Sequence, residues 1–534
     1  MDGKLYEMLN RAWIQTCKIL FGEEIGELKE YETYIKSFLD NIKIPNYGKF
    51  YKHVKSEITG KEVGVFLPFY NNKAKFIEMN AIATLDIKPL HLDEIKDIDS
   101  IVNAWRERWY YRAGVIQGNS THVEKSDAIY DSHWVYNSYL IEESQYIFHS
   151  LWVRDKSKYL FASGGGPDIS MSIRSFYGGM AKRLFEAYMF ISSSDVYFSH
   201  TIIGSNEIMF SFSQRGKHYV IGNLELEPNK YRKIKESLLE QIRAELTSKK
   251  SLPSLIELIN GRTELPKKEK VNISYSIKPS NFDKIDEGFR KTIKLLIKEE
   301  FSLKELDQFL SKKRNEPPIP IKSFFGKEGY FYPIVHYTQL NSFSMKNRIS
   351  FWDEMDSSGS IHLTEQDISS FDDIKKNIGK IALITQEIRH GNNSNLIQVM
   401  IGVNSSNIYR VIDAALSKHQ AISFIGCPSS NYVYGSSMLF HSTFAINSNK
   451  GDNLNRVFET DQCSNSSDIY FSHNIEGSND VMFSQHLKGT RYTIGNLVLD
   501  KEKYYNIKDS LLSQIRDELR TKHTLHIDIE HMGV

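Results

Sequence analysis

The sequence predicts a tandem duplication of an α+β unit, in which each unit has N-terminal helices, a β-solenoid of six-residue repeats (a parallel β-helix) and a C-terminal capping helix. Two observations support this fold class. The stretch 193–223, SSDVYFSHTIIGSNEIMFSFSQRGKHYVIGN, matches the stretch 466–496, SSDIYFSHNIEGSNDVMFSQHLKGTRYTIGN, at 19 of 31 positions without a gap. Within each stretch a small polar residue also returns every six residues, and internal periods of this kind are typical of repeat architectures.

The duplication covers both units from end to end. The offset of 273 residues between the two stretches continues through 224–246 against 497–519, and it extends backward to 157–163 against 430–436. Further upstream the offset changes by a few residues, as TGKEVGVFLP from position 59 and FGKEGYFYP from position 325 show. We therefore predict a first unit over 1–248, a linker with prolines and a charge cluster over 249–281, and a second unit over 282–534.

The six-residue period places the solenoid at about 126–223 in the first unit and about 399–496 in the second. An aliphatic residue often follows the small residue by three positions, and stacked small and aliphatic residues fill the narrow axis of a solenoid. The period slips by one residue before Ser157 and before Ser430, which predicts a bulge there. A period of six fits coils of twelve or of eighteen residues, and we favour twelve. After the slip, the serines at the small position of the first unit are Ser157, Ser163, Ser175, Ser193, Ser199, Ser205 and Ser211.

An open solenoid end exposes backbone edges, so each solenoid is expected to have a cap. The helix predicted over 228–246 supplies the first cap, because Pro228 suits a first helical turn and apolar residues recur at every fourth position from Ile234 to Leu246. The helix predicted over 501–519 has the same spacing from Ile507 to Leu519.

Composition limits the classes of function. Lys and Arg total 67 against 66 Asp and Glu, so the chain lacks the global basic field of many nucleic-acid-binding proteins, and it shows no DNA-binding signature. Cys17, Cys427 and Cys463 lack metal-ligand spacing, so we expect no disulfide framework, no metal and no other cofactor. Because the sequence has no apolar leader and no apolar run of about 18 residues, we expect a cytoplasmic protein without a membrane span.

Two recurrent pairs of residues are the candidates for catalysis. His200 and His473 share the context YFSHxIxGSN, and hexapeptide acyltransferases use a histidine as their base. Asp195 and Asp468 stand just before predicted strands, and solenoid enzymes of the pectin-lyase type work with carboxylates on one sheet. The more ordinary interpretations are histidines that bond a neighbouring loop and aspartates that form turns. The absence of HEXXH, GxSxG and CxxC motifs disfavours an enzyme.

The segment 104–112, AWRERWYYR, is a candidate binding surface. Its arginines alternate with flat aromatic rings, a composition suited to stacking the bases and pairing the phosphates of single-stranded RNA. The corresponding segment of the second unit, IGKIALITQ, lacks these residues. The more ordinary interpretation is an aromatic helix that covers the flank of the solenoid. The candidate partner-binding residues are Trp105, Arg106, Arg108, Trp109, Tyr110, Tyr111 and Arg112, together with Lys267, Lys268 and Lys270 of the basic linker.

The end of each unit resembles a group of uncharacterised proteins. The stretches GKHYVIGNLELEPNKYRKIKESLLEQI and GTRYTIGNLVLDKEKYYNIKDSLLSQI are similar to the last solenoid coil and capping helix of archaeal and candidate-phylum proteins with six-residue Ser/Cys/Asn repeats. The resemblance covers about a tenth of the chain in each copy. Those proteins look cysteine-rich, with a zinc ribbon in front, whereas this chain has neither feature. The resemblance therefore implies the fold and no metal site.

The sequence favours a non-enzymatic binding protein in which two solenoid units engage a large cytoplasmic partner. A ribosome or another ribonucleoprotein is the partner that we name first, and the chain would then be a hibernation or translation-inhibiting factor. One alternative is a solenoid enzyme, an acyltransferase or a carbohydrate-active enzyme, with equivalent clefts in both units. A second alternative is a structural subunit that assembles through its solenoid edges.

Overall fold

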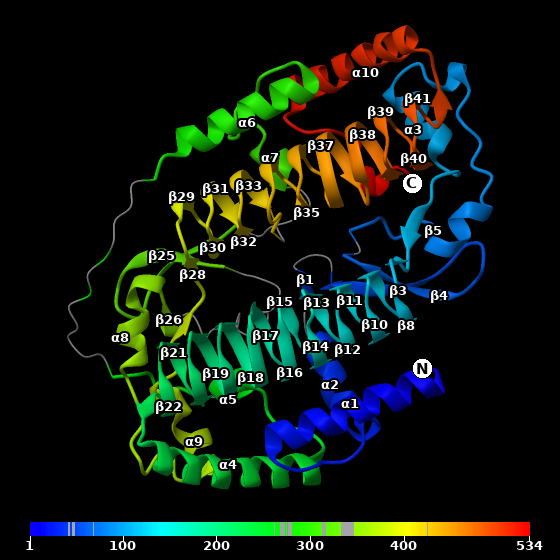
Figure 1. Cartoon of the computed structure of the whole chain (residues 1–534). Helices are drawn as coiled ribbons and strands as arrows, with labels where there is room; N and C mark the ends of the chain where they lie inside the picture. The colour runs from blue at the N-terminus through cyan, green and yellow to red at the C-terminus, as the bar shows by residue number, and fades with distance from the viewer. Residues whose placement is uncertain are drawn as a thin grey trace.

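The computed structural model describes residues 1–40, 43–44, 48–67, 69–260, 262–267, 273, 275, 280–311, 317–332, 347–423 and 426–533 (Figure 1). Its largest elements are two parallel β sheets, each preceded by helices and followed by a helix. The helices are α1 (Gly3–Phe21), α2 (Leu28–Asp40), α3 (Ile98–Trp105), α4 (Pro228–Lys249), α5 (Leu255–Asn260), α6 (Phe282–Ile297), α7 (Asp307–Ser311), α8 (Met355–Gly359), α9 (Phe371–Asn377) and α10 (Lys501–Lys522).

The first sheet has 17 strands, which are parallel except at the antiparallel closing pair β22–β23. Its strands are β7 (Ile116–Gln117), β8 (Thr121–Glu124), β9 (Asp127–Tyr130), β10 (His133–Tyr136), β11 (Tyr139–Glu142), β12 (Gln145–Phe148), β13 (Leu151–Arg154), β14 (Lys158–Phe161), β15 (Gly164–Pro167), β16 (Ile169–Ile173), β17 (Phe176–Gly179), β18 (Ala181–Ile191), β19 (Ser194–Ile203), β20 (Asn206–Met209), β21 (Phe212–Arg215), β22 (His218–Ile221) and β23 (Leu224–Glu225).

The second sheet has 12 strands and ends in the same way, with the antiparallel pair β41–β42. Its strands are β29 (Ser394–Ile397), β31 (Ser406–Val411), β33 (Lys418–Ser423), β34 (Asn431–Tyr434), β35 (Ser437–Phe440), β36 (Thr443–Ile446), β37 (Asn449–Asp461), β38 (Ser464–Glu476), β39 (Asn479–Met482), β40 (Gln485–Lys488), β41 (Arg491–Ile494) and β42 (Leu497–Val498). A three-stranded parallel sheet of the same unit contains β28 (Ile388–His390), β30 (Ile401–Val403) and β32 (Asp413–Ala415).

The remaining strands form two-stranded sheets. These pairs are β1 (Lys43–Ile44) with β2 (Gly48–Lys49), β3 (Tyr51–Lys55) with β4 (Glu62–Phe66), β5 (Phe76–Glu78) with β6 (Tyr111–Ala113), β24 (Ile319–Lys322) with β25 (Glu328–Phe331), and β26 (Ile349–Ser350) with β27 (Ile384–Thr385).

The strand register repeats every twelve residues, as in the pairing of His133 with Gln145 and of Lys182 with Ser194. This register confirms the favoured twelve-residue repeat over the alternative of eighteen. The register lengthens to thirteen where Gln145 pairs with Lys158, and again between β33 and β34, so the predicted one-residue slip is confirmed in both units. In the first unit the extra residue lies in the turn between β13 and β14, and not as a bulge within a strand.

The recurrent serines bond one repeat to the next. The hydroxyl of Ser199 accepts a hydrogen bond from the backbone N–H of Ser211 at 3.0 Å, and it donates to the carbonyl oxygen of Tyr197 at 2.8 Å. A buried backbone amide needs a partner, and here a side chain supplies it, which explains the small hydroxyl residue at this position. The same bond joins Ser132 to Ser144, Ser138 to Ser150, Ser430 to Ser442, Ser436 to Ser448 and Ser472 to Ser484.

The predicted aliphatic positions lie inside the sheets. In the first sheet Leu160, Val196 and Ile208 belong to one buried aliphatic cluster, and in the second sheet Val433 and Ile469 belong to another. Burying such side chains contributes about 1.5–3 kcal/mol each relative to exposure. The two sheets also share a third cluster, in which Leu140, Trp152 and Tyr177 of the first sheet join Met400 and Met438 of the second unit. The two units therefore form one continuous core.

Each unit also sends a segment across to the sheet of the other unit. We call residues 69–113 and 347–388 the crossing segments. Figure 1 shows β5 and α3 beside β40 and β41, and α8 and α9 beside β21 and β22. The backbone N–H of Leu90 donates to the carbonyl oxygen of Gly495 at 2.8 Å, and that of Leu363 donates to Gly222 at 2.9 Å. The same 273-residue offset relates both partners, so the exchange between the units is reciprocal.

The predicted helices at the unit ends are observed as α4 and α10, each three residues longer than expected. They share the end of each sheet with the crossing segments, because the Leu363 amide and the Ile361 carbonyl oxygen bond Gly222 and Asn223 of the terminal repeat. The helix alone therefore does not cover the end. Among the described residues, no helix is long and apolar enough to cross a membrane.

Candidate functional site

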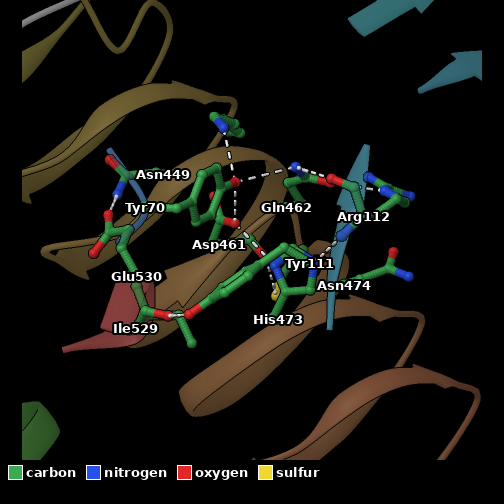
Figure 2. Close-up of polar contacts among 12 residues, drawn as sticks. Tyr70, Tyr111, Arg112, Asn449, Asp461, Gln462, His473, Asn474, Ile529 and Glu530 are labelled. Atoms are coloured by element: carbon green, nitrogen blue, oxygen red, sulfur yellow. Dashed lines mark hydrogen bonds and ion pairs between the residues drawn. The ribbon is translucent and has the colours of Figure 1, made fainter. Parts of the chain in front are cut away.

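His473, the first catalytic candidate, lies in a buried polar network between the second sheet and the first crossing segment (Figure 2). Its Nε2 accepts a hydrogen bond from the backbone N–H of Arg112 at 2.8 Å, and its Nδ1 lies 2.9 Å from Oδ2 of Asp461. Because a backbone N–H can only donate, the ring proton sits on Nδ1 and is donated to Asp461. Both ring nitrogens are engaged by the protein, so neither is available to a substrate.

Asp461 is held ionised by its surroundings. Burial opposes the charge, but Lys450, His473 and Tyr70 together lower the pKa of Asp461 to about 2. The hydroxyl of Tyr70 donates to Oδ2 of Asp461 at 2.8 Å and accepts from Nζ of Lys450 at 2.9 Å. Burial lowers the pKa of His473 despite the nearby carboxylate, so this histidine is neutral at pH 7.

His200 occupies the equivalent position of the first unit but lacks the carboxylate. Tyr188 stands where the second unit has Asp461, and its ring stacks on His200 with centroids 6.3 Å apart. His200 is fully buried, its Nδ1 lies 2.7 Å from Oγ1 of Thr201, and burial lowers its pKa to about 3. The hydroxyl of Thr201 donates to the carbonyl oxygen of Thr385, which belongs to the second crossing segment. Both histidines therefore lie at contacts between the units, as the ordinary interpretation expected for a neighbouring segment.

Asp195 and Asp468 form equivalent ion pairs. Asp195 accepts from Nε and Nη2 of Arg183 at 2.6 and 2.5 Å, and Asp468 accepts from the same atoms of Arg456 at 2.8 and 2.6 Å. Each arginine lies one repeat earlier on the neighbouring strand. Burial opposes the charge of Asp195, but Arg183 lowers the pKa of that carboxyl below its usual value. The expectation of turn residues is wrong here, because both aspartates lie within long strands and their partners are on the adjacent repeat.

The aromatic rings of the segment 104–112 face the second unit. Trp105, Trp109 and Tyr111 are fully buried, and the indole N–H of Trp105 donates to the carbonyl oxygen of Phe483 at 2.8 Å. The hydroxyl of Tyr111 donates to the carbonyl oxygen of Ile529 at 2.9 Å (Figure 2). These ring faces are not accessible to a stacked base. The segment covers a flank, as the ordinary interpretation expected, but the flank belongs to the opposite unit.

The polar members of this segment are also used by the fold. Arg108 donates to Glu94 at 2.7 Å, Arg112 donates through Nε to Gln462 at 2.8 Å, and the amide of Tyr110 donates to Gln485 at 2.9 Å. Arg106 stays exposed, and so does Lys267 of the predicted linker. Lys268 and Lys270 lie outside the described residues.

An open groove of about 530 Å³ runs along the outer flank of the first sheet. Ser170, Lys182, Ser194 and Asn206 line it as successive register partners on neighbouring strands. Neighbouring strands lie about 4.8 Å apart, so these side chains form a row with regular spacing. Met180 lies beside the row with 51% of its surface exposed. The sequence marks these positions only as the outward residues of the repeat.

A search for related proteins adds no functional information, because no family model, no curated protein and no solved structure matches this chain.

Proposed function

We propose that the chain is a non-enzymatic binding protein built from two interlocked β-solenoids with coils of twelve residues. The repeated register and the serine bonds between repeats support the solenoid interpretation. Helices α4 and α10 act as caps together with the crossing segments of the opposite unit. Interlocking makes the two solenoids a single rigid body, and a rigid surface lowers the entropy cost of binding a large partner.

The open groove along 168–206 is the observation that carries this proposal. Its row of hydroxyl, amide and ammonium groups at one-strand spacing offers many weak polar contacts to an extended partner. A ribonucleoprotein is the partner class that we propose, because Lys182, with Ser170, Ser194 and Asn206, provides the groups that bind phosphate and ribose oxygens. Arg106 and Lys267 add exposed positive charge elsewhere on the molecule.

The proposal is tested by affinity purification of the tagged full-length chain from lysate, with and without ribonuclease. The Lys182→Glu variant reverses the charge in the groove, and Asn455→Glu is the matched control at the equivalent exposed position of the second unit. We expect ribosomal proteins and RNA in the eluate, lost on ribonuclease treatment and reduced by Lys182→Glu only. An eluate without RNA, or equal recovery with Lys182→Glu and wild type, contradicts the proposal.

Neither alternative has a supporting observation within the described residues. An acyltransferase or carbohydrate-active enzyme needs His200, His473, Asp195 or Asp468 facing a substrate, whereas these side chains bond to the protein itself. A self-assembling subunit needs a free sheet end, whereas the terminal repeats are covered by the crossing segments.

A further inference from the structure

A second cavity lies at the other end of the first unit, between α2, the strand β3 and the start of the first sheet. Its volume is about 470 Å³, within the range of small-molecule sites, which is about 300–1,000 Å³. Lys36, Lys49, Lys52 and Lys125 reach it from four different elements, and Glu32 is the one carboxylate among its described lining residues. We propose that this cavity binds the phosphate group of a small phosphorylated molecule.

The positive charge of the cavity is only partly neutralised by the protein. Nζ of Lys49 donates to Asp40 at 2.9 Å, and Nζ of Lys125 lies 3.5 Å from Glu62. Lys36 and Lys52 form no ion pair with a described carboxylate, and Nζ of Lys52 lies 4.8 Å above the ring of Phe76. Two ammonium groups are therefore left to balance a dianion, and a partly enclosed cavity strengthens that attraction relative to open solvent.

A buried polar atom in the cavity wall also lacks a partner. His149 is only 2% exposed, and its Nδ1 lies 2.6 Å from the amide nitrogen of Asn137. With that amide donating to Nδ1, the ring proton lies on Nε2. Nε2 has no hydrogen-bond partner among the described residues, and Oε1 of Glu32 is 3.9 Å away. An unsatisfied buried donor costs about 1–3 kcal/mol, so a ligand oxygen at this position restores a bond that the protein alone leaves unmade.

The rest of the wall suits an organic part attached to the phosphate. The Tyr51 ring is fixed by stacking on Tyr139, with centroids 4.5 Å apart, and by donating to Asp40 at 2.6 Å. Tyr136 forms part of the opposite wall, and Asn72 adds an amide. Rigid aromatic walls with a few fixed polar groups are the usual composition of a small-molecule site.

The second unit lacks this site, which provides an internal control. At the offset of 273 residues, Gln398 replaces Lys125, Arg410 replaces Asn137 and Ile422 replaces His149. Arg410 is paired with Asp307, and Ile422 is fully buried in an apolar cluster. The proposal therefore requires one ligand per chain, and not two.

Isothermal titration calorimetry of the full-length chain with adenosine 5′-monophosphate, ribose 5-phosphate, inorganic phosphate and adenosine tests the proposal. We expect the phosphorylated probes to bind at one per chain, adenosine not to bind, and the two organic phosphates to bind more tightly than inorganic phosphate. Equal binding of all three phosphate probes identifies free phosphate as the source of the ligand group. No binding of any phosphate probe at millimolar concentration, or two sites per chain, overturns the proposal.

Substitutions separate this site from general charge effects. Lys36→Gln and Lys125→Gln change exposed side chains, so folding is retained, and each is expected to weaken phosphate-probe binding about tenfold through one lost charged hydrogen bond. Lys156→Gln, an exposed lysine in a turn of the same sheet and outside the cavity lining, is the matched control and leaves the affinity unchanged. Equal affinities for all three variants and wild type place the binding elsewhere and refute the assignment.

Discussion

Replacing Ser199 by alanine removes one hydroxyl from the row of serines that joins the repeats. The hydroxyl accepts the N–H of Ser211 at 3.0 Å, so the substitution leaves that buried amide without its acceptor. The carbonyl oxygen of Tyr197 loses a donor at 2.8 Å but keeps the N–H of Phe210 at 2.9 Å, so it is not left unpaired. The cost is thus that of one orphaned buried N–H, about 1–3 kcal/mol in the free energy of unfolding.

The assay is equilibrium unfolding in urea followed by circular dichroism, combined with hydrogen exchange of a peptide that contains Ser211. Ser472→Ala tests the equivalent bond of the second unit, in which Ser472 accepts from Ser484 at 3.1 Å, and should cost the same. Ser237→Ala on the exposed face of α4 is the control, with an expected change within about 0.5 kcal/mol. If Ser199→Ala is as mild as Ser237→Ala and exchange at Ser211 is unchanged, the serine bonds do not support the fold as argued.

Two further predictions concern the contacts between the units. Burial lowers the folded pKa of His200 to about 3, below the usual value near 6.5, so its contribution is complete above pH 6.5 and is lost as the pH falls toward 3. Urea unfolding across this range should show stability falling by up to about 1.4 kcal/mol per pH unit from this group, and His200→Phe should flatten the profile; an unchanged profile contradicts a buried neutral histidine. At Gly495, with φ +59°, an added Cβ would lie 2.6 Å from Cδ1 of Leu90, whereas Gly477, with φ +57°, has no neighbour within 4 Å. Gly495→Ala should therefore lower the melting temperature more than Gly477→Ala, and equal effects would show that only backbone strain matters.

The repeat itself could be predicted because it is local. Serines at every sixth position and aliphatic residues three positions later specify strand register and inner face together, since a shift by one residue would bury the wrong side chains. Asp195 could also have been placed correctly from a signal in the sequence. Arg183 precedes it by twelve residues, and Arg456 precedes Asp468 by the same interval, which is one repeat in both copies.

The exchange between the units could not be predicted in this way. An apolar residue such as Leu90 or Trp105 has the same pattern whether it packs on its own sheet or on the other one, because burial is not directional. The basic cavity was missed for a related reason. Its residues range from Glu32 to His149 over several elements, and no local spacing connects them.

The most direct test of the account is to express residues 1–275 and 280–534 as separate chains, alone and together, and to measure their mass by light scattering. Because each crossing segment completes the sheet of the other unit, neither half should be a stable monomer alone. Together they should form a complex with one copy of each half that unfolds like the intact chain. Two stable monomers that do not associate would contradict the reciprocal exchange on which the account depends.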